Sequence, residues 1–114
     1  MTTDFARLLA LRRQDLSERL AAVEARLDAI RAERSAATDD DEHDPEGSTL
    51  STEWSRAEGQ RADAVRELAD LEAALGRVEA GTYGVCASCG RAIPLERLRL
   101  LPAATLCVRC ASSA

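Results

Sequence analysis

The chain contains two Cys-x-x-Cys pairs, Cys86-Ala87-Ser88-Cys89-Gly90 and Leu106-Cys107-Val108-Arg109-Cys110, which hold all four of its cysteines. Each pair places two thiols on one tight turn, so both sulfurs can face the same point. Two such turns can supply four thiolates at about 2.3 Å to a tetrahedral Zn²⁺, and the separation of the pairs is typical of a four-cysteine zinc site. Gly90 allows a left-handed backbone after the first pair. We therefore predict one Zn²⁺, bound by Cys86, Cys89, Cys107 and Cys110.

The predicted zinc site is structural rather than catalytic, because four cysteines complete the coordination sphere. The single histidine, His43, lies far away in the sequence, whereas Arg91 and Arg109 are close enough to offset the negative charge of the thiolates. Two alternatives stay open. Two disulfides would need an oxidising compartment, for which the sequence shows no leader, so we expect a cytoplasmic protein. A thiol redox switch, in which oxidation releases the zinc, would need exposed thiolates.

The composition is typical of long helices rather than of a large globular core. Of 114 residues, 46% are hydrophobic but only 3% are aromatic, and no stretch approaches the length of a membrane span. The net charge is −5, and residues 38–48 contain six acidic side chains and no basic one. Because duplex affinity depends on neutralising phosphates, we expect no direct sequence-specific DNA binding.

A long helix is predicted from Phe5 to about Ala37, where proline and glycine are absent. Its apolar residues recur at intervals of three and four, which is the spacing of a coiled-coil stripe. The members of this stripe are Leu9, Leu16, Leu20, Val23, Leu27 and Ile30.

A second helix is predicted after the acidic segment. Asp44-Pro45-Glu46-Gly47 has the composition of a tight turn, and Ser48 or Thr49 would then cap the new helix. The stripe of this helix again has intervals of three and four. It consists of Trp54, Ala57, Arg61, Ala64, Leu68, Leu71, Leu75 and Val78.

The two stripes are mirror images of each other. Pairing Ala37 with Trp54, and so on down to Arg13 with Val78, gives residue numbers that always add up to 91. The mirror centre lies at 45.5, inside the predicted turn at Pro45. This pattern predicts an antiparallel coiled-coil hairpin, in which Trp54 faces the small Ala37.

The C-terminal part is predicted to be a small zinc-binding module. Gly81 is a natural end for the second helix, and Pro94 can begin a short helix. Leu95, Leu98 and Leu101 would share one face of that helix and pack near Phe5, Leu8 and Leu9.

The predicted fold class is mainly α: a long antiparallel hairpin over residues 1–80, with an acidic tip at 38–48, and a zinc-finger module over residues 81–114 at its base.

The acidic tip has two interpretations. It is either a solvated loop, kept polar because loops face water, or a cluster of carboxylates presented to a metal or a basic pocket. Asp44 and Glu46 flank Pro45 and are best placed to reach a partner, while His43 is better explained as a turn residue. Because a hairpin tip offers no enclosing pocket, we expect that the protein is not an enzyme.

The run from Val78 to Gly90 reads Val-Glu-Ala-Gly-Thr-Tyr-Gly-Val-Cys-Ala-Ser-Cys-Gly, and Ile93-Pro94, Arg97-Leu98, Pro102 and Leu106-Cys107-x-x-Cys110 follow it. These residues resemble the DksA/TraR zinc-finger family, over about residues 48–110. The resemblance implies a bacterial transcription factor that binds RNA polymerase directly rather than DNA. In that family the hairpin enters the secondary channel of the polymerase, and carboxylates at its tip act near the catalytic Mg²⁺ to modulate initiation, sometimes together with the alarmone ppGpp.

The tip departs from the Asp-x-x-Asp-x-Ala pattern of well-studied members of that family. Counting back from Cys86 without gaps places His43, Glu46 and Ser48 at these positions, and a shift of two residues places Asp41, Asp44 and Glu46 there. The resemblance therefore implies partner contacts by Asp41, His43, Asp44 and Glu46 in a monomer, and it leaves a response to ppGpp open. The alternative function is a zinc-stapled protein-interaction module whose tip takes no part in binding.

Overall fold

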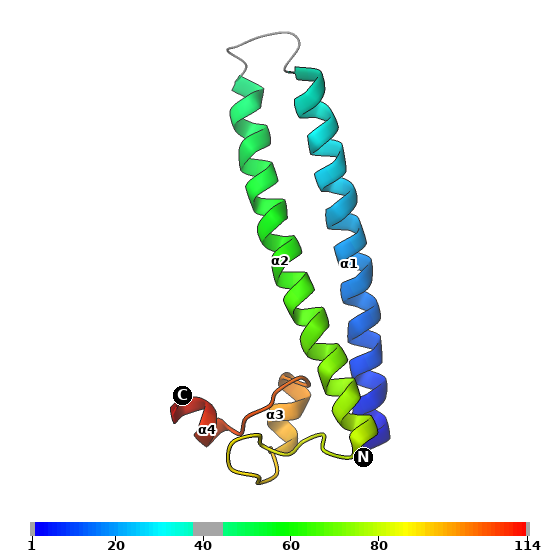
Figure 1. Cartoon of the computed structure of the whole chain (residues 1–114), viewed down its shortest axis with the longest axis vertical. Coiled ribbons are helices and arrows are strands. Elements are labelled where there is room, and N and C mark those ends of the chain that lie inside the picture. The colour runs from blue at the N-terminus through cyan, green and yellow to red at the C-terminus, as the bar shows by residue number, and fades with distance from the viewer. Residues whose placement is uncertain (1, 38–44, 114) are drawn as a thin grey trace. The chain divides into compact units, whose positions relative to one another are not determined.

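The protein is mainly helical, as predicted. The structure, a computed structural model, describes residues 2–37 and 45–113. Its elements are α1 (Thr2–Ala37), α2 (Pro45–Ala80), α3 (Leu95–Leu100) and α4 (Val108–Ser113) (Figure 1). The described residues form no strand, and Val85 and Ala92 make one isolated antiparallel bridge. Two long helices with a four-cysteine module confirm the predicted fold class.

Contacts divide the chain into two compact units. One unit, the cysteine unit, consists of Met1–Asp15 and Leu68–Ala114, and the other, the hairpin unit, consists of Leu16–Glu67. Both long helices contribute residues to both units. Residues 81–114, for which we predicted a separate module, share the cysteine unit with one end of each long helix.

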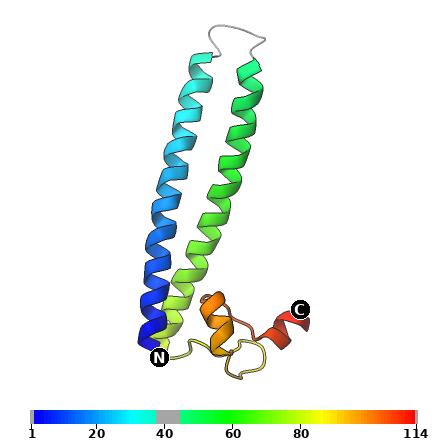
Figure 2. The same cartoon turned by 180° about the vertical axis from the view of Figure 1, so that it is seen from behind.

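The hairpin unit is held together by a narrow apolar stripe. The segments of α1 and α2 in this unit run side by side in opposite directions, as both views show (Figures 1 and 2). Leu27 and Ile30 of α1 are each 4% exposed, and the heptad-spaced Leu50, Ala57 and Ala64 of α2 are also buried. Burying a leucine or isoleucine contributes about 1.5–3 kcal/mol relative to leaving it exposed. The predicted stripe is therefore confirmed here, and Leu50 extends it.

Two ion pairs link α1 to α2 in the hairpin unit. Arg61 Nε lies 3.6 Å from Glu24 Oε2, and Arg26 lies 4.0 Å from Glu53. Both pairs are substantially exposed, so each contributes only about 0–1 kcal/mol. They confirm the antiparallel direction, but their residue numbers add up to 85 and 79 rather than to the predicted 91.

Trp54 contacts two arginines of α1, whereas the predicted register paired it with Ala37, whose side chain lies outside the described residues. The guanidinium carbons of Arg31 and Arg34 lie 5.4 and 5.9 Å from the centre of the indole ring, within the range of a cation–π interaction. Because α1 ends at Ala37 and α2 begins at Pro45, the midpoint of the two helix ends is residue 41 rather than 45.5. The partner of a given residue on the other helix is therefore displaced by about two to three helical turns from the predicted one.

Pro45 begins α2 instead of lying in a tight turn. The helix includes Glu46 and Gly47, which contradicts the predicted turn and the predicted cap at Ser48 or Thr49. The physical reason is that proline suits the first position of a helix, where its missing N–H has no helical partner. Of the predicted tip contacts, Asp41, His43 and Asp44 lie outside the described residues, and Glu46 belongs to the first turn of α2.

Gly81 ends α2, as predicted. Its φ of +78° is a left-handed conformation that glycine adopts without a Cβ penalty. The amide of Gly81 donates to the Val78 carbonyl at 3.2 Å, and the amide of Thr82 donates to the Arg77 carbonyl at 2.9 Å. This cap satisfies carbonyls at the helix end and directs the chain into Tyr83 and the first cysteine pair.

The core of the cysteine unit forms around Cys86, Ile93 and Leu98, which are at most 3% exposed. Phe5 and Tyr83 pack against this cluster, with their ring centres 5.6 Å apart. Leu9 and Ala74 on the long helices are also fully buried in this unit.

Of the three leucines predicted to share a buried face, only Leu98 is buried. Leu95 is 38% exposed and Leu101 is 52% exposed. The reason is the shortness of α3, which begins after Pro94 as predicted but has only six residues. Leu101 is its C-cap, with a φ of −130° outside the helical range.

Candidate metal centre

The first cysteine pair lies on a tight loop that its own backbone closes. The amide of Cys86 donates to the Arg91 carbonyl at 2.8 Å, and the amide of Gly90 donates back to the Cys86 carbonyl at 2.9 Å. Gly90 has a φ of +74°, which confirms the predicted left-handed position. The loop therefore turns back on itself within five residues, and Cys86 and Cys89 lie on the same turn.

The second cysteine pair lies at the start of α4. The amide of Ala111 donates to the Cys107 carbonyl at 2.9 Å, which fixes Cys107 and Cys110 on one helical turn. The amide of Ala87 donates to the Thr105 carbonyl at 2.8 Å. This hydrogen bond joins the backbone of the first pair to the segment that leads into the second.

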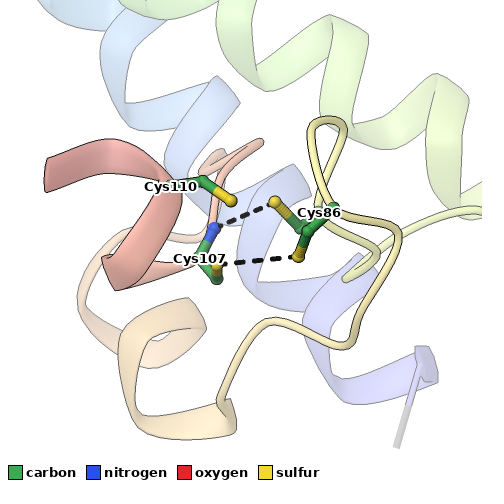
Figure 3. Close-up of side chains that lie close together, drawn as sticks. Cys86, Cys107 and Cys110 are labelled. Atoms are coloured by element: carbon green, nitrogen blue, oxygen red, sulfur yellow. Dashed lines mark hydrogen bonds between the residues drawn. The ribbon is translucent and has the colours of Figure 1, made fainter. Parts of the chain in front are cut away.

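The structure brings the four predicted ligands together. All four Sγ atoms lie within 4.8 Å of one another, and the sulfurs of Cys89 and Cys107 are 3.9 Å apart. Tetrahedral coordination at about 2.3 Å places neighbouring sulfurs about 3.8 Å apart, so the observed spacing fits Zn²⁺. None of the cysteines forms a disulfide. Figure 3 shows the sulfurs of Cys86 and Cys110 turned toward the same centre, next to Cys107.

Hydrogen bonds lower the pKa values of Cys86 and Cys107 and raise the pKa of Cys110. The pKa of Cys86 is lowered to about 6, because the amides of Cys89 and Cys107 donate to its sulfur. The amide of Cys110 likewise lowers the pKa of Cys107. The pKa of Cys110 is raised to about 12, mainly because its thiol hydrogen-bonds to Cys107. Sulfurs this close to one another are linked by the hydrogen bonds of their remaining thiol protons. A divalent cation bound between the sulfurs can replace those protons.

The donor set is that of one structural Zn²⁺. Four thiolates fill a tetrahedral coordination sphere and leave no open position for a substrate. Cys86 is 1% exposed, Cys107 and Cys110 are half-buried, and Cys89 is exposed. The metal therefore joins a buried ligand in the core of the cysteine unit to three ligands nearer its surface.

Three side chains outside the cysteine pairs hold the segment before Cys107. The Tyr83 hydroxyl donates to the Pro102 carbonyl at 2.8 Å, Arg77 donates to the Ala103 carbonyl at 3.4 Å, and Arg97 Nε donates to the Leu106 carbonyl at 2.8 Å. Burial raises the pKa of Tyr83, and the nearby charge of Arg77 opposes this shift. Sequence reasoning missed these contacts, because bonds to backbone carbonyls leave no residue pattern.

The two arginines singled out from the sequence, Arg91 and Arg109, are exposed. They line an open groove of about 780 Å³ beside the cysteines, together with Pro94, Leu106 and Val108.

Among the described residues, no helix is both long and apolar enough to cross a membrane.

Comparison with known proteins identifies the C-terminal module. Residues 81–114 match the family described as the prokaryotic dksA/traR C4-type zinc finger. An uncharacterized protein of Aquifex aeolicus is 40% identical over 47 residues, which are 41% of this chain and 32% of that protein. The uncharacterized protein YteA of Bacillus subtilis is 53% identical over 38 residues, or 33% of this chain and 16% of YteA. The matches thus span about a third and a sixth of these relatives.

The fold is similar to that of a solved transcription factor. The structure of DksA2 from Pseudomonas aeruginosa superposes with a TM-score of 0.82, covering 98% of this chain and 81% of that chain at 24% sequence identity. The likeness extends far beyond the zinc-binding residues and includes both long helices. Residues 81–114 are thus similar to the DksA/TraR-type C4 zinc finger, and the fold of the chain is similar to that of DksA2.

Proposed function

We propose that the protein is a bacterial transcription regulator that binds RNA polymerase in the cytoplasm as a monomer. One observation carries the proposal: a DksA/TraR-type zinc finger at residues 81–114 occurs within a fold that matches a transcription factor over 98% of the chain. The role of the metal is structural, because zinc held by four cysteines stabilises a small module. The zinc ligands are Cys86, Cys89, Cys107 and Cys110. Other parts of the chain contact the polymerase.

The proposed action is insertion of the acidic tip into the secondary channel of the polymerase. Residues 38–48 carry six acidic side chains and no basic one, and carboxylate oxygens are ligands that Mg²⁺ prefers. The residues proposed to contact the partner are Asp41, His43, Asp44 and Glu46. In this mechanism the tip acts near the catalytic Mg²⁺ to modulate initiation.

Binding is tested first, with purified core polymerase immobilised on a resin. We expect the protein to be retained at low salt and to elute as the ionic strength rises, because exposed charges are screened. Absence of retention across the whole salt series would contradict the proposal.

The role of the tip is tested by neutralising it. The double variant Asp44→Asn, Glu46→Gln should still bind polymerase but lose its effect on transcription from a ribosomal promoter. A matched control, Asp70→Asn with Glu72→Gln, neutralises two exposed acids of α2 and should act like the unmodified protein. Running both reactions with and without ppGpp reports whether the alarmone contributes. If the neutral tip acts as strongly as the acidic one, insertion at the catalytic centre is excluded.

A second candidate function rests on the apolar surface of the zinc module. Leu100 is 76% exposed and Leu101 is 52% exposed, although leucine is usually buried. This surface fits a protein-interaction module in which the tip is only a solvated loop. That function predicts that Leu100→Ser abolishes retention on polymerase, whereas neutralising the tip leaves both retention and the effect on transcription unchanged.

A further inference from the structure

The segment that delivers Cys107 to the metal is held from two elements. Tyr83, which follows α2, binds the carbonyl of Pro102, and Arg97 of α3 binds the carbonyl of Leu106. Pro102 is buried, and Leu106 packs against the core cluster. The segment is therefore fixed at both ends, and its last peptide group leads directly into a zinc ligand.

That last peptide group makes two hydrogen bonds of different kinds. Its carbonyl, which belongs to Leu106, accepts from Arg97 Nε at 2.8 Å. Its N–H, which belongs to Cys107, donates to the sulfur of Cys86 at 3.4 Å, as Figure 3 shows. Because a peptide group is planar, fixing the direction of the carbonyl also fixes the direction of the N–H. The guanidinium of Arg97 and the sulfur of Cys86 are thus joined through one rigid group.

The charge of the guanidinium strengthens the second bond. Hydrogen bonds from ionised donors are about twice as strong as neutral ones, and a chain of hydrogen bonds polarises its members in the same sense. An N–H polarised in this way is a better donor to a thiolate. The contact therefore strengthens the hydrogen bond that holds the Cys86 sulfur in place.

The position of Arg97 is itself fixed by packing. The next residue, Leu98, is 3% exposed and belongs to the same core cluster as Cys86. Leu101 closes α3 by donating to the Arg97 carbonyl at 2.7 Å. By contrast, Arg99 on the same short helix is exposed, which makes it a matched control.

We propose that Arg97 is a positioning residue of the zinc centre. By holding the Leu106 carbonyl, it directs the Cys107 N–H at the Cys86 sulfur and so increases the affinity of the four cysteines for zinc. Arg97 does not touch the metal, and the polymerase-binding function is not needed for this role.

The test compares Arg97→Met, which keeps an unbranched apolar side chain but has no donor, with Arg99→Met. Zinc affinity is measured on the full chain by competition with a chromogenic chelator. Losing a contact of this kind typically weakens metal affinity about 10–100-fold, so we expect a loss in that range for Arg97→Met and less than about 2-fold for Arg99→Met. Arg97→Lys should restore part of the affinity, because it returns a charged donor. Equal affinities for the two methionine variants would overturn the proposal.

A spectroscopic measurement separates positioning from general stability. Co²⁺ bound by four thiolates in a tetrahedral site absorbs visible light, and the absorption depends on the ligand geometry. We expect altered bands in Arg97→Met and unchanged bands in Arg99→Met. Lower thermal stability with unchanged bands and unchanged zinc affinity would show that Arg97 only supports the fold. If Arg97→Met does not fold, Arg97→Lys is compared with Arg99→Lys, and equal affinities would again overturn the proposal.

Discussion

Tyr83 follows the end of α2 and contacts both α1 and the segment that leads to the second cysteine pair. Its ring packs against Phe5 and its hydroxyl donates to the Pro102 carbonyl within the cysteine unit. A phenol in this setting loses its proton reluctantly, because burial disfavours the charged form and the hydrogen bond needs the proton. The structure accordingly raises the pKa of Tyr83.

Titration of Tyr83 tests this environment directly, since it is the only tyrosine in the chain. The absorbance change on phenol ionisation should have its midpoint above the ordinary value of 10.0. Because the folded-state pKa is raised, the stabilising effect is fully present below the unfolded-state pKa and is lost as pH rises through the folded-state pKa. Unfolding in denaturant should return the midpoint to the ordinary value. A native midpoint at or below that value would contradict the packing described for the hydroxyl.

Gly84 shows how closely the first cysteine loop approaches α3. Its φ is +80°, and a Cβ added there would lie 3.4 Å from the Leu98 side chain. Gly84→Ala should therefore lower the free energy of unfolding by about 1 kcal/mol or more, because an alanine at this φ is strained. Gly59 lies in α2 with open space around it, so Gly59→Ala should instead raise the free energy of unfolding by up to about 1 kcal/mol. Urea unfolding of both variants checks the opposite signs.

Individual residues also show which parts of the site the sequence could predict. The four zinc ligands followed from spacing alone, because coordination demands sulfurs at fixed intervals. Arg97 and Tyr83 could not be found in this way, because their partners are backbone carbonyls, which every residue has. For Arg91 and Arg109 the sequence allows either compensation of the thiolate charge or ordinary exposed arginines, and both are exposed.

At the scale of the helices, the apolar spacing predicted which residues are buried better than it predicted their partners. Leu27, Ile30, Ala57 and Ala64 are all buried as expected. The predicted register is wrong because a heptad pattern stays compatible with a shift of a whole heptad, about two helical turns, and only the positions of the helix ends distinguish such alignments. Pro45 is compatible with both a turn and a helix start, and assigning it to a turn agreed with the wrong alignment.

Apolar residues of α1 should contribute unequally to stability, depending on whether they belong to the buried stripe. Ile30 is 4% exposed, whereas Leu11 on the same helix is 60% exposed. Ile30→Ala should lower the free energy of unfolding by about 2–4 kcal/mol, because it removes buried methyl groups and leaves a cavity. Leu11→Ala, the control, should change it by less than about 0.5 kcal/mol. Similar losses for both variants in urea unfolding would show that the stripe is assigned to the wrong face.

For the whole molecule, the metal and the long helices should respond differently to chelation. The described part of residues 81–114 contains two six-residue helices and a small core around Cys86, Ile93 and Leu98. A module of this kind depends on its metal for folding, whereas the helices of the hairpin unit depend on their apolar stripe.

Zinc removal should therefore raise amide hydrogen exchange strongly in residues 81–114 and little in the hairpin unit. Chelation should reduce the far-ultraviolet helical signal only slightly, because most helical residues belong to α1 and α2. Adding zinc back should restore protection. Loss of protection in the hairpin unit to the same extent as in residues 81–114 would mean that the two units unfold together.

The buried alanines of the hairpin unit allow a short distance between the axes of its two helices. Ala57 is 1% exposed and Ala64 is 8% exposed, and methyl side chains at such positions let two helix axes approach to about 8 Å, the lower limit of ordinary helix packing. Leucine at the same places would push the axes apart and widen the cross-section. A pair of closely packed helices fits into a narrower opening than a pair held further apart. Ala57 and Ala64 therefore lower the minimum width of an opening that could accept the hairpin.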